Sequence, residues 1–258
     1  MTADYLLIDV GNGRTKFALS TRDGLLDRRE AATKELSPHV LEATLAGWSF
    51  GRAVACSVVP AATGVLRQHF GLSMVELKHD GVLGIGVRYP KPASIGPDRL
   101  ANAVALASLY TKPGVPGIVI DFGTAVTFDV LSADHHYIGG VIAPGLRLMT
   151  DYLHERTALL PQVELREPET AIGQSTEGAI LAGAAIGYRG MVRGILEALR
   201  EELPGGEGAA VVATGGDGEW IVRGMGGIQA VDADLTLHGL RLVGNLAAAP
   251  ATTPGRLI

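Results

Sequence analysis

The sequence predicts a two-lobed α/β protein, and the main reason is an internal repeat. The segment Leu7–Ser20 aligns without a gap on Val119–Ser132, which pairs Asp9 with Asp121 and Gly11 with Gly123. The two copies lie close to half the chain apart, so a duplicated domain explains them. Each copy has a buried strand that ends in Asp-x-Gly, a tight turn and a second strand. Such hairpins, each followed by strand–helix units, are typical of two lobes with a cleft between them.

Apolar runs and turn residues predict the remaining elements. We expect strands over residues 15–20, 53–59, 125–131, 136–142 and 209–213. We expect helices over residues 39–47, 98–110 and 175–200, the last capped by Ser175 or Thr176 and open to a break at Gly187 or Gly190. Residues 113–117 form the expected boundary, which gives lobes at 1–115 and 116–258 and a frayed tail after Asn245.

Composition excludes several classes of protein. The chain has 258 residues, 47% of them apolar and 19% charged, as in a packed globular protein. Its net charge is -5 without a Lys/Arg cluster, so we expect no nucleic-acid partner. Cys56 is the only cysteine and cannot form an internal disulfide, which fits the reducing cytosol. We expect it to be a buried small residue. No signal peptide and no uncharged stretch of membrane-spanning length are found, so we expect a cytoplasmic protein without a membrane partner.

The two Asp-x-Gly turns carry the first chemical prediction. Gly11-Asn12-Gly13 lacks a third glycine and leads into a strand, so a dinucleotide-binding loop is a weak interpretation. A glycine turn can still direct backbone N–H groups at a phosphate, with charge from Arg14 or Lys16. Asp9 and Asp121 offer the oxygen ligands that cations prefer. A single turn of this kind is ordinary, but two copies in register favour a shared nucleotide site.

Two further segments suggest a site. Gly96, Asp98 and Arg99 precede a predicted helix, where Asp98 could simply cap the first turn. The same residues suit phosphoryl transfer to an alcohol, because a carboxylate can accept the hydroxyl proton and a guanidinium can hold a substrate carboxylate. Thr214-Gly-Gly216 follows a strand and would allow close approach of an adenosine, or would form a plain turn.

Taken together, these motifs resemble those of type III pantothenate kinases, from about residue 5 to residue 245. The matching motifs, in the order of that family, are Asp9–Lys16, Tyr89 with Gly96–Arg99, Asp121–Ala125, Gly139–Gly145, Thr157–Pro161, Ser175–Ala179 and Thr214–Gly216. The resemblance implies two duplicated ribonuclease-H-like lobes of the actin-like ATPase, sugar-kinase and Hsp70 superfamily, with a central nucleotide cleft. It also implies ATP-dependent phosphorylation of pantothenate to 4'-phosphopantothenate, the first step of coenzyme A biosynthesis.

The resemblance implies a role for each matching residue. Asp98 would be the general base, and Asp121 would bind a monovalent cation, K⁺ or NH₄⁺, beside the Mg²⁺ that accompanies ATP. The residues expected to bind pantothenate are Tyr89, Gly96, Pro97, Asp98, Arg99 and Thr176. The residues expected to bind ATP are Asp9, Val10, Gly11, Asn12, Gly13, Arg14, Thr15, Lys16 and Thr124. The family resemblance also implies a homodimer in which the partner closes the substrate pocket.

One motif position departs from the family, and two other functions stay open. The family usually has Thr or Ser where this chain has Gly13, so a hydroxyl contact near the phosphates is missing. The alternatives are a kinase of another small hydroxylated acceptor, or a non-catalytic regulatory relative with the same fold. The combination of Lys16, Asp98, Arg99 and Asp121 argues against the non-catalytic alternative.

Overall fold

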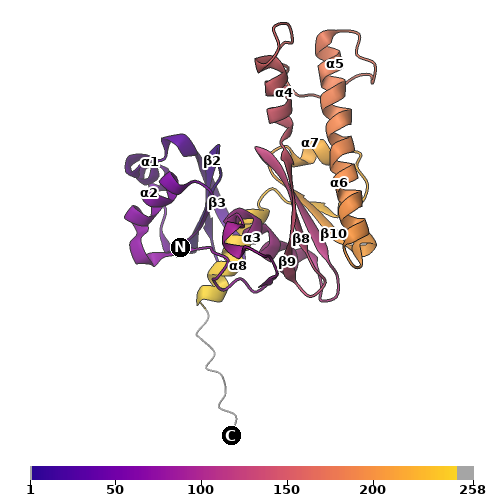
Figure 1. Cartoon of the computed structure of the whole chain (residues 1–258). Helices are drawn as coiled ribbons and strands as arrows, with labels where there is room; N and C mark the ends of the chain where they lie inside the picture. Colours follow the sequence, from indigo (N-terminus) through magenta and orange to yellow (C-terminus); the bar gives the residue numbers. More distant parts are fainter. Residues whose placement is uncertain (1, 249–258) are drawn as a thin grey trace. The chain divides into compact units, whose positions relative to one another are not determined.

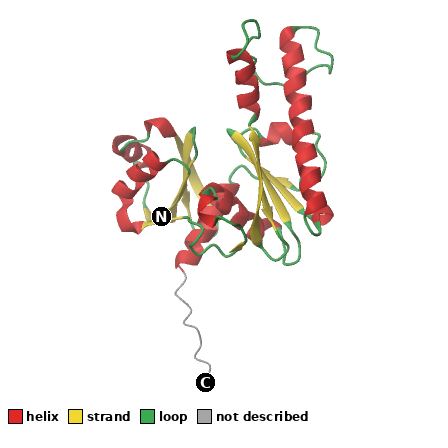
Figure 2. Ribbon diagram, viewed as in Figure 1, coloured by secondary structure: helices red, strands yellow, loops and turns green. Residues whose placement is uncertain are grey.

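The computed structural model describes residues 2–248, which form two compact α/β units with one sheet each (Figures 1 and 2). The first unit contains the chain up to Gly84, Ala93–Val104 and the chain from Thr236 onward, and the second contains Ile85–Pro92 and Ala105–Leu235. The mixed α/β fold with two sheets confirms the predicted fold class.

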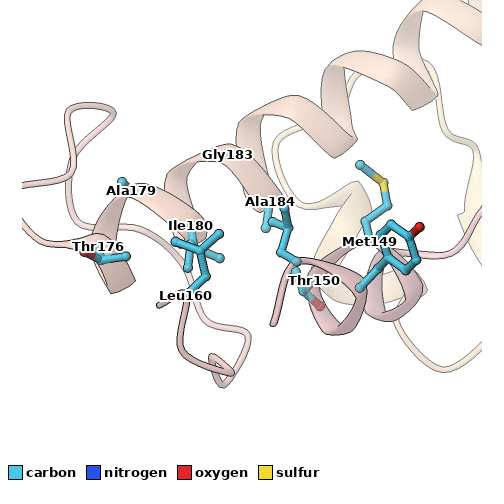
Figure 3. Close-up of a pocket in the computed structure, with 10 residues that line it drawn as sticks. Met149, Thr150, Leu160, Thr176, Ala179, Ile180, Gly183 and Ala184 are labelled. Carbon is cyan, nitrogen blue, oxygen red and sulfur yellow. The ribbon is translucent and has the colours of Figure 1, made fainter. Parts of the chain in front are cut away.

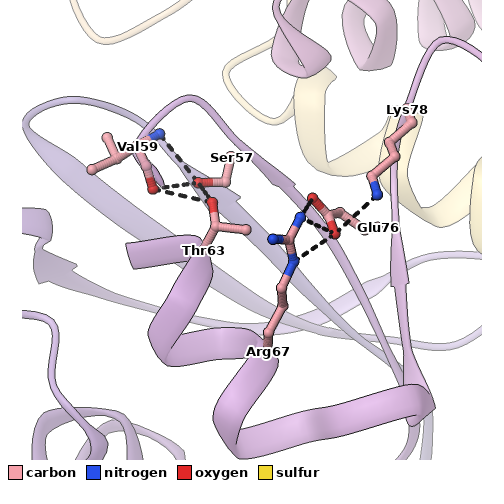
Figure 4. Close-up of polar contacts among 6 residues, drawn as sticks. All are labelled: Ser57, Val59, Thr63, Arg67, Glu76 and Lys78. Carbon is pink, nitrogen blue, oxygen red and sulfur yellow. Dashed lines mark hydrogen bonds and ion pairs between the residues drawn. The ribbon is translucent and has the colours of Figure 1, made fainter. Parts of the chain in front are cut away.

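The sheet of the first unit has five strands in the order β3-β2-β1-β4-β5. Their bounds are β1 Ala3–Val10, β2 Arg14–Ser20, β3 Leu25–Ala32, β4 Phe50–Ser57 and β5 Met74–Glu76. Helices α1 (Pro38–Leu45) and α2 (Pro60–Phe70) cover one face, where Leu6, Ile8 and Phe17 are fully buried. Figure 4 shows how α2 is fixed: Thr63 hydrogen-bonds to Ser57 ahead of the helix, and Arg67 pairs with Glu76 on β5.

Helices α3 (Pro97–Ala105) and α8 (Leu235–Ala248) complete the first unit. A Cβ atom at Gly239 of α8 would lie 2.0 Å from the carbonyl oxygen of Ala101, so only glycine permits this close packing of the helices. The Thr236 hydroxyl donates to Asn102 Oδ1 at 2.8 Å. Because the last helix packs with the first unit, the two units do not divide at the predicted boundary between residues 115 and 116.

The sheet of the second unit has six strands in the order β11-β10-β7-β8-β9-β6. Their bounds are β6 Gly86–Val87, β7 Gly117–Phe122, β8 Ala125–Leu131, β9 His136–Pro144, β10 Ala210–Thr214 and β11 Ala230–Val231. Its helices are α4 Leu146–Glu155, α5 Thr176–Ala182, α6 Tyr188–Glu202 and α7 Gly218–Val222. Tyr188, Val192 and Leu196 of α6 pack on Ile118, Ile120 and Phe122 in the core of this unit.

The two hairpins of the repeat form as predicted, with one difference. Strands β1 and β2 pair Val10 with Thr15 across the first turn, whereas β7 and β8 pair Phe122 with Val126 across the second. The second turn is therefore one residue shorter, and the gapless alignment does not hold structurally beyond it. The Gly11 N–H donates to Arg14 in one turn and the Gly123 N–H donates to Ala125 in the other.

The long predicted helices are present and unbroken. Residues 106–110 continue α3 as a π-helical turn, and residues 183–187 join α5 to α6 in the same way. Ser175 is the N-cap of α5, since its side chain accepts the Gly178 N–H. The predicted fraying after Asn245 is not seen up to Ala248, where α8 ends, and residues 249–258 lie outside the described residues.

One helical stretch of the described residues, Thr176–Glu202, is long and apolar enough to cross a membrane by length and composition alone. The sequence-based expectation missed it because that expectation required a stretch without charge. The apolar part of this helix is 44% buried within the protein, and Tyr188, Val192 and Leu196 face the core. These features fit a core helix.

Candidate active site

The first unit brings the acid of the phosphate motif and the acid of the acceptor motif to one place. Asp9 lies opposite Lys16 on β2 and opposite Cys56 on β4, so the three share one face of the sheet. The Cys56 thiol donates to Asp9 Oδ1 at 3.4 Å. Burial raises the pKa of this thiol well above its ordinary value, and the charges of Asp9 and Asp98 raise it further. Both carboxylates therefore lie near the same buried sulfur atom.

Asp98 occupies the first turn of α3, directly after Pro97. Its Oδ1 accepts the N–H of Arg99 at 2.8 Å, so the carboxylate does bind the helix backbone, as the capping interpretation expected. Burial raises its pKa above the ordinary value, and the N–H and guanidinium of Arg99 lower it in part. A raised pKa on a carboxylate suits a general base, since it strengthens the affinity for a proton.

Gly96 leaves room for this carboxylate. A Cβ atom at Gly96 would lie 2.5 Å from Asp98 Oδ1, closer than two such atoms can approach. The glycine of the acceptor motif therefore permits the position of Asp98 because it has no side chain. Any larger residue would displace the carboxylate.

The phosphate motif forms the turn between β1 and β2. Asn12, Gly13 and Arg14 are exposed and Lys16 is half-buried, so their groups can reach a ligand. The Arg14 guanidinium pairs with Glu30 on β3 at 2.5 Å, with both side chains in solvent. Thr15 is different, because its side chain is fully buried and its hydroxyl lies 3.0 Å from that of Thr33. The backbone of Thr15 is the only part left to contact a nucleotide.

The second unit holds the other half of the repeat. Asp121 is the penultimate residue of β7, and the parallel neighbour β10 places Thr214 beside it. Thr124 lies in an exposed turn that close backbone contacts hold in place, since the Gly145 N–H donates to the Thr124 carbonyl at 3.1 Å and a Cβ atom at Gly215 would lie 2.4 Å from the Phe122 carbonyl. Gly215 also has a left-handed backbone, with φ of 92°. The glycines of the Gly139–Gly145 and Thr214–Gly216 motifs thus shape the turn that carries Thr124.

Tyr89 is fixed to the second unit. Its ring meets that of Tyr137 edge to face at 6.2 Å, and a Cβ atom at Gly139 would lie 3.6 Å from it. The preceding Arg88 pairs with Asp134. Tyr137 in turn donates to the buried Asp129 at 3.3 Å. No sequence pattern pointed to Tyr137, because an aromatic residue in a strand usually belongs to the core.

Thr176 borders an apolar cavity of 590 Å³ within the second unit (Figure 3). The cavity lies between α4 and the helix that begins at Thr176, and Leu160 closes one side. It is lined by Met149, Thr150, Tyr152, Leu153, Leu160, Thr176, Ala179, Ile180, Gly183 and Ala184. Thr176 is one of its few polar groups, which suits the recognition of a small, partly apolar molecule.

Comparison with known proteins identifies the family. The sequence model described as type III pantothenate kinase matches residues 5–198. A type III pantothenate kinase of Akkermansia muciniphila is 50% identical, over 94% of this chain and 98% of the relative. One of Methylacidiphilum infernorum is 42% identical, over 93% and 88%.

The chain belongs to the type III pantothenate kinase family. It is therefore an enzyme, a kinase of pantothenate in coenzyme A biosynthesis, and the resemblance seen in the motifs is confirmed.

Solved structures support the fold. A putative Baf family transcriptional activator from Campylobacter jejuni superposes with a TM-score of 0.58 at 20% identity, over 94% of this chain and 98% of that one. A putative 2-dehydro-3-deoxygalactonokinase from Sinorhizobium meliloti gives 0.56 at 15% identity, over 98% and 100%. At such identities the likeness concerns the fold alone, which is the predicted actin-like and sugar-kinase fold.

Proposed function

We propose that this chain transfers the γ-phosphoryl group of ATP to the hydroxyl of pantothenate with Asp98 as general base. A bond forms between the hydroxyl oxygen and the γ-phosphorus, the bond to the β–γ bridging oxygen breaks, and ADP leaves. Asp98 accepts the proton of the hydroxyl. The observation that supports this proposal is that Asp9 and Asp98 belong to the same unit and that the charges of both act on the buried thiol of Cys56, to which Asp9 is hydrogen-bonded.

The other predicted site residues divide between the units. In the first, Arg99 would hold the pantothenate carboxylate, and the turn Gly11–Arg14 with Lys16 would hold the phosphates. In the second, Thr124 would contact the nucleotide, and Tyr89 and Thr176 would contact pantothenate. The apolar cavity beside Thr176 supports this role, since pantothenate has an apolar part next to its reacting hydroxyl.

Two cations would assist the reaction. The described residues contain no group of three or more acidic, histidine or cysteine side chains that could hold a metal. Mg²⁺ with a nucleotide does not need such a group, since one or two carboxylates and phosphate oxygens suffice, and Asp9 fits this part. There Mg²⁺ would neutralise phosphate charge. K⁺ or NH₄⁺ would lie by Asp121, the penultimate residue of β7, with Thr214 of β10 beside it.

We also propose that the protein is a cytoplasmic homodimer. Leu148, Met149, Tyr152 and Leu153 of α4 are all exposed and lie on one side of the helix, which supports an interface there. A second chain on this surface would border the cavity beside Thr176. That arrangement would let the partner close the pantothenate pocket.

A coupled assay of ADP release tests the function. With ATP, Mg²⁺ and K⁺, we expect turnover that requires pantothenate, and none with a panel of sugars and small hydroxy acids. Mass spectrometry should find one phosphoryl group added to pantothenate. Turnover with a different acceptor would favour the alternative kinase, and ATP binding without any turnover would favour the regulatory relative.

A further inference from the structure

Thr33 lies directly against the phosphate motif, with two contacts to its turn and one to Thr15 on β2. It follows β3, as the first residue of a short 3₁₀ helix, and is almost fully buried. Its hydroxyl donates to the carbonyl of Gly11 at 2.8 Å, and its N–H donates to the carbonyl of Gly13 at 3.1 Å. Its hydroxyl also lies 3.0 Å from that of Thr15.

These contacts form a directed chain of hydrogen bonds. A threonine hydroxyl has a single hydrogen to donate, and that of Thr33 is committed to Gly11. The hydroxyl of Thr15 must therefore be the donor between the two threonines. Both side chains are buried, so water does not compete readily for either bond. The chain runs from Thr15 through Thr33 to the carbonyl of Gly11.

The chain sets the direction of the N–H groups in the turn. Thr15 and Lys16 are neighbours on β2, so their side chains point to opposite faces of the sheet. The carbonyl of Gly11 is held on the Thr15 side. Across a planar trans peptide the next N–H, that of Asn12, points the opposite way, toward the face with Lys16 and Asp9. The bond from Thr33 to Gly13 fixes the other end of the turn.

We propose that Thr33 is a positioning residue for ATP, which holds the turn Gly11–Gly13 so that its N–H groups face the phosphates. The proposal rests on the proposed role of this turn in binding ATP. Thr33 itself touches no substrate. Its effect passes through the backbone, because phosphate recognition by N–H groups depends on their common direction.

The test compares variants that differ only in the hydroxyl. Thr33→Val keeps the shape and the N–H but loses the donor to Gly11. We expect the KM for ATP to rise about tenfold, because a turn without this bond directs its N–H groups less well at the charged phosphates. The KM for pantothenate should change less than twofold. Thr33→Ser should restore the KM for ATP. If Thr33→Val does not fold, Thr33→Ala and Thr33→Ser form a second pair that differs in the same hydroxyl.

A matched control separates position from stability. Ser20 lies at the other end of β2, fully buried, with its hydroxyl 2.6 and 3.0 Å from the carbonyls of Thr21 and Gly24. Ser20→Ala should lower the melting temperature but leave the KM for ATP unchanged. The rise in melting temperature that ATP causes, measured against each variant's own ligand-free value, should shrink for Thr33→Val only. An unchanged KM for ATP in Thr33→Val overturns the proposal, as does an equal effect in Ser20→Ala.

The role of the turn and the role of Thr33 can fail separately. Lys16→Met removes the charge that β2 presents beside the turn, without touching the hydroxyl chain. If Lys16→Met weakens ATP binding and Thr33→Val does not, the turn binds ATP and only the inference about Thr33 is wrong. If neither Lys16→Met nor Thr33→Val changes the KM for ATP, the turn does not hold phosphates and the inference about Thr33 is overturned with it.

Discussion

At the scale of single residues, Asp98 combines a structural contact with a chemical task. Its Oδ1 accepts the N–H of Arg99, so an amide in its place would keep this contact. We therefore expect Asp98→Asn to lower kcat by roughly 10²–10⁴-fold, while ATP still binds. Steady-state kinetics with an ATP-binding measurement tests this. Near-normal turnover would reduce Asp98 to a residue that only stabilises the helix.

The pH dependence of Asp98 has a defined sign. Burial raises its pKa in the folded protein, so the base is lost as pH falls through a value above that of an ordinary aspartate. The same shift means that the ionised carboxylate destabilises the folded state: the stability it contributes is present below the unfolded pKa and is lost as pH rises through the folded one. Asp98→Asn should thus have an equal or higher melting temperature at pH 7, which thermal denaturation measures.

Gly13 is the position where this chain departs from its family. A threonine at this position would either supply the missing hydroxyl contact or strain a turn that needs glycine. Gly13 does not have a left-handed backbone, and a Cβ atom placed there would meet no heavy atom of the surrounding structure within 4 Å. The structure gives no reason for strain. We expect Gly13→Thr to lower the KM for ATP about tenfold at an unchanged melting temperature.

Kinetics and melting curves of Gly13→Thr check this, with Gly11→Ala as a contrast. A Cβ atom at Gly11 would lie 3.3 Å from the Arg14 carbonyl, so that variant should disturb the turn. A lower melting temperature in Gly13→Thr would support the strain outcome instead. No change in either quantity would mean that residue 13 does not face the phosphates.

Sequence patterns draw attention to residues with chemical side chains more readily than to the residues that hold them in place. Asp9 and Asp121 stand out because two Asp-x-Gly turns lie in register, and Asp98 because it stands between Gly96 and a predicted helix; the roles of all three stay predictions. Cys56 was expected to be buried and is, but its bond to Asp9 joins strands that are far apart in the sequence. Thr33 gave no signal, because a threonine after a strand is ordinary. Only the fold shows that it meets Gly11 and Gly13.

At the scale of elements, two parallel strand ends define the proposed cation site. Strands β7 and β10 end side by side, which places Asp121 next to Thr214. A carboxylate with nearby backbone carbonyls suits a monovalent cation. At equal ionic strength we expect high activity in K⁺ or NH₄⁺ and a sharp loss in Na⁺. Asp121→Ala should abolish the difference between the salts.

Glu207→Ala is the control for this experiment, since it removes an exposed acid elsewhere in the same unit. That variant should keep the full response to K⁺. Equal rates in K⁺ and Na⁺ for the unaltered protein would contradict a cation at Asp121. A response that survives Asp121→Ala would place the cation elsewhere.

Elements with a strong local pattern were predicted well, and those that depend on distant partners were not. The hairpins β1–β2 and β7–β8 and the helices from Pro97 and Thr176 have clear apolar patterns or caps. The helices α2, α4 and α8 were missed. Strand β3 was missed because it is an edge strand with charged, exposed residues. The π-helical turns at 106–110 and 183–187 have no known sequence pattern and depend on packing.

At the scale of the whole molecule, the exposed apolar side of α4 leads to the last prediction, a homodimer. Leu146 and Thr150 of this helix are buried, while Leu148, Met149, Tyr152 and Leu153 are exposed. Leu148 faces solvent, and Met149, Tyr152 and Leu153 stay exposed although they line the cavity beside Thr176, and such a continuous apolar surface is unusual for a protein that stays a monomer. We expect sedimentation velocity to give twice the 26.8 kDa of a single chain.

Leu148→Glu tests the location of the interface, because Leu148 is exposed and does not line the cavity beside Thr176. A buried charge at the interface should convert the dimer to monomer and raise the KM for pantothenate, since the partner would no longer close its pocket. Leu72→Glu is the control: Leu72 is also fully exposed but lies in the first unit, so the dimer should persist. A fully active monomer of 26.8 kDa would rule out the dimer, and a dimer that survives Leu148→Glu would place the interface away from this side of α4.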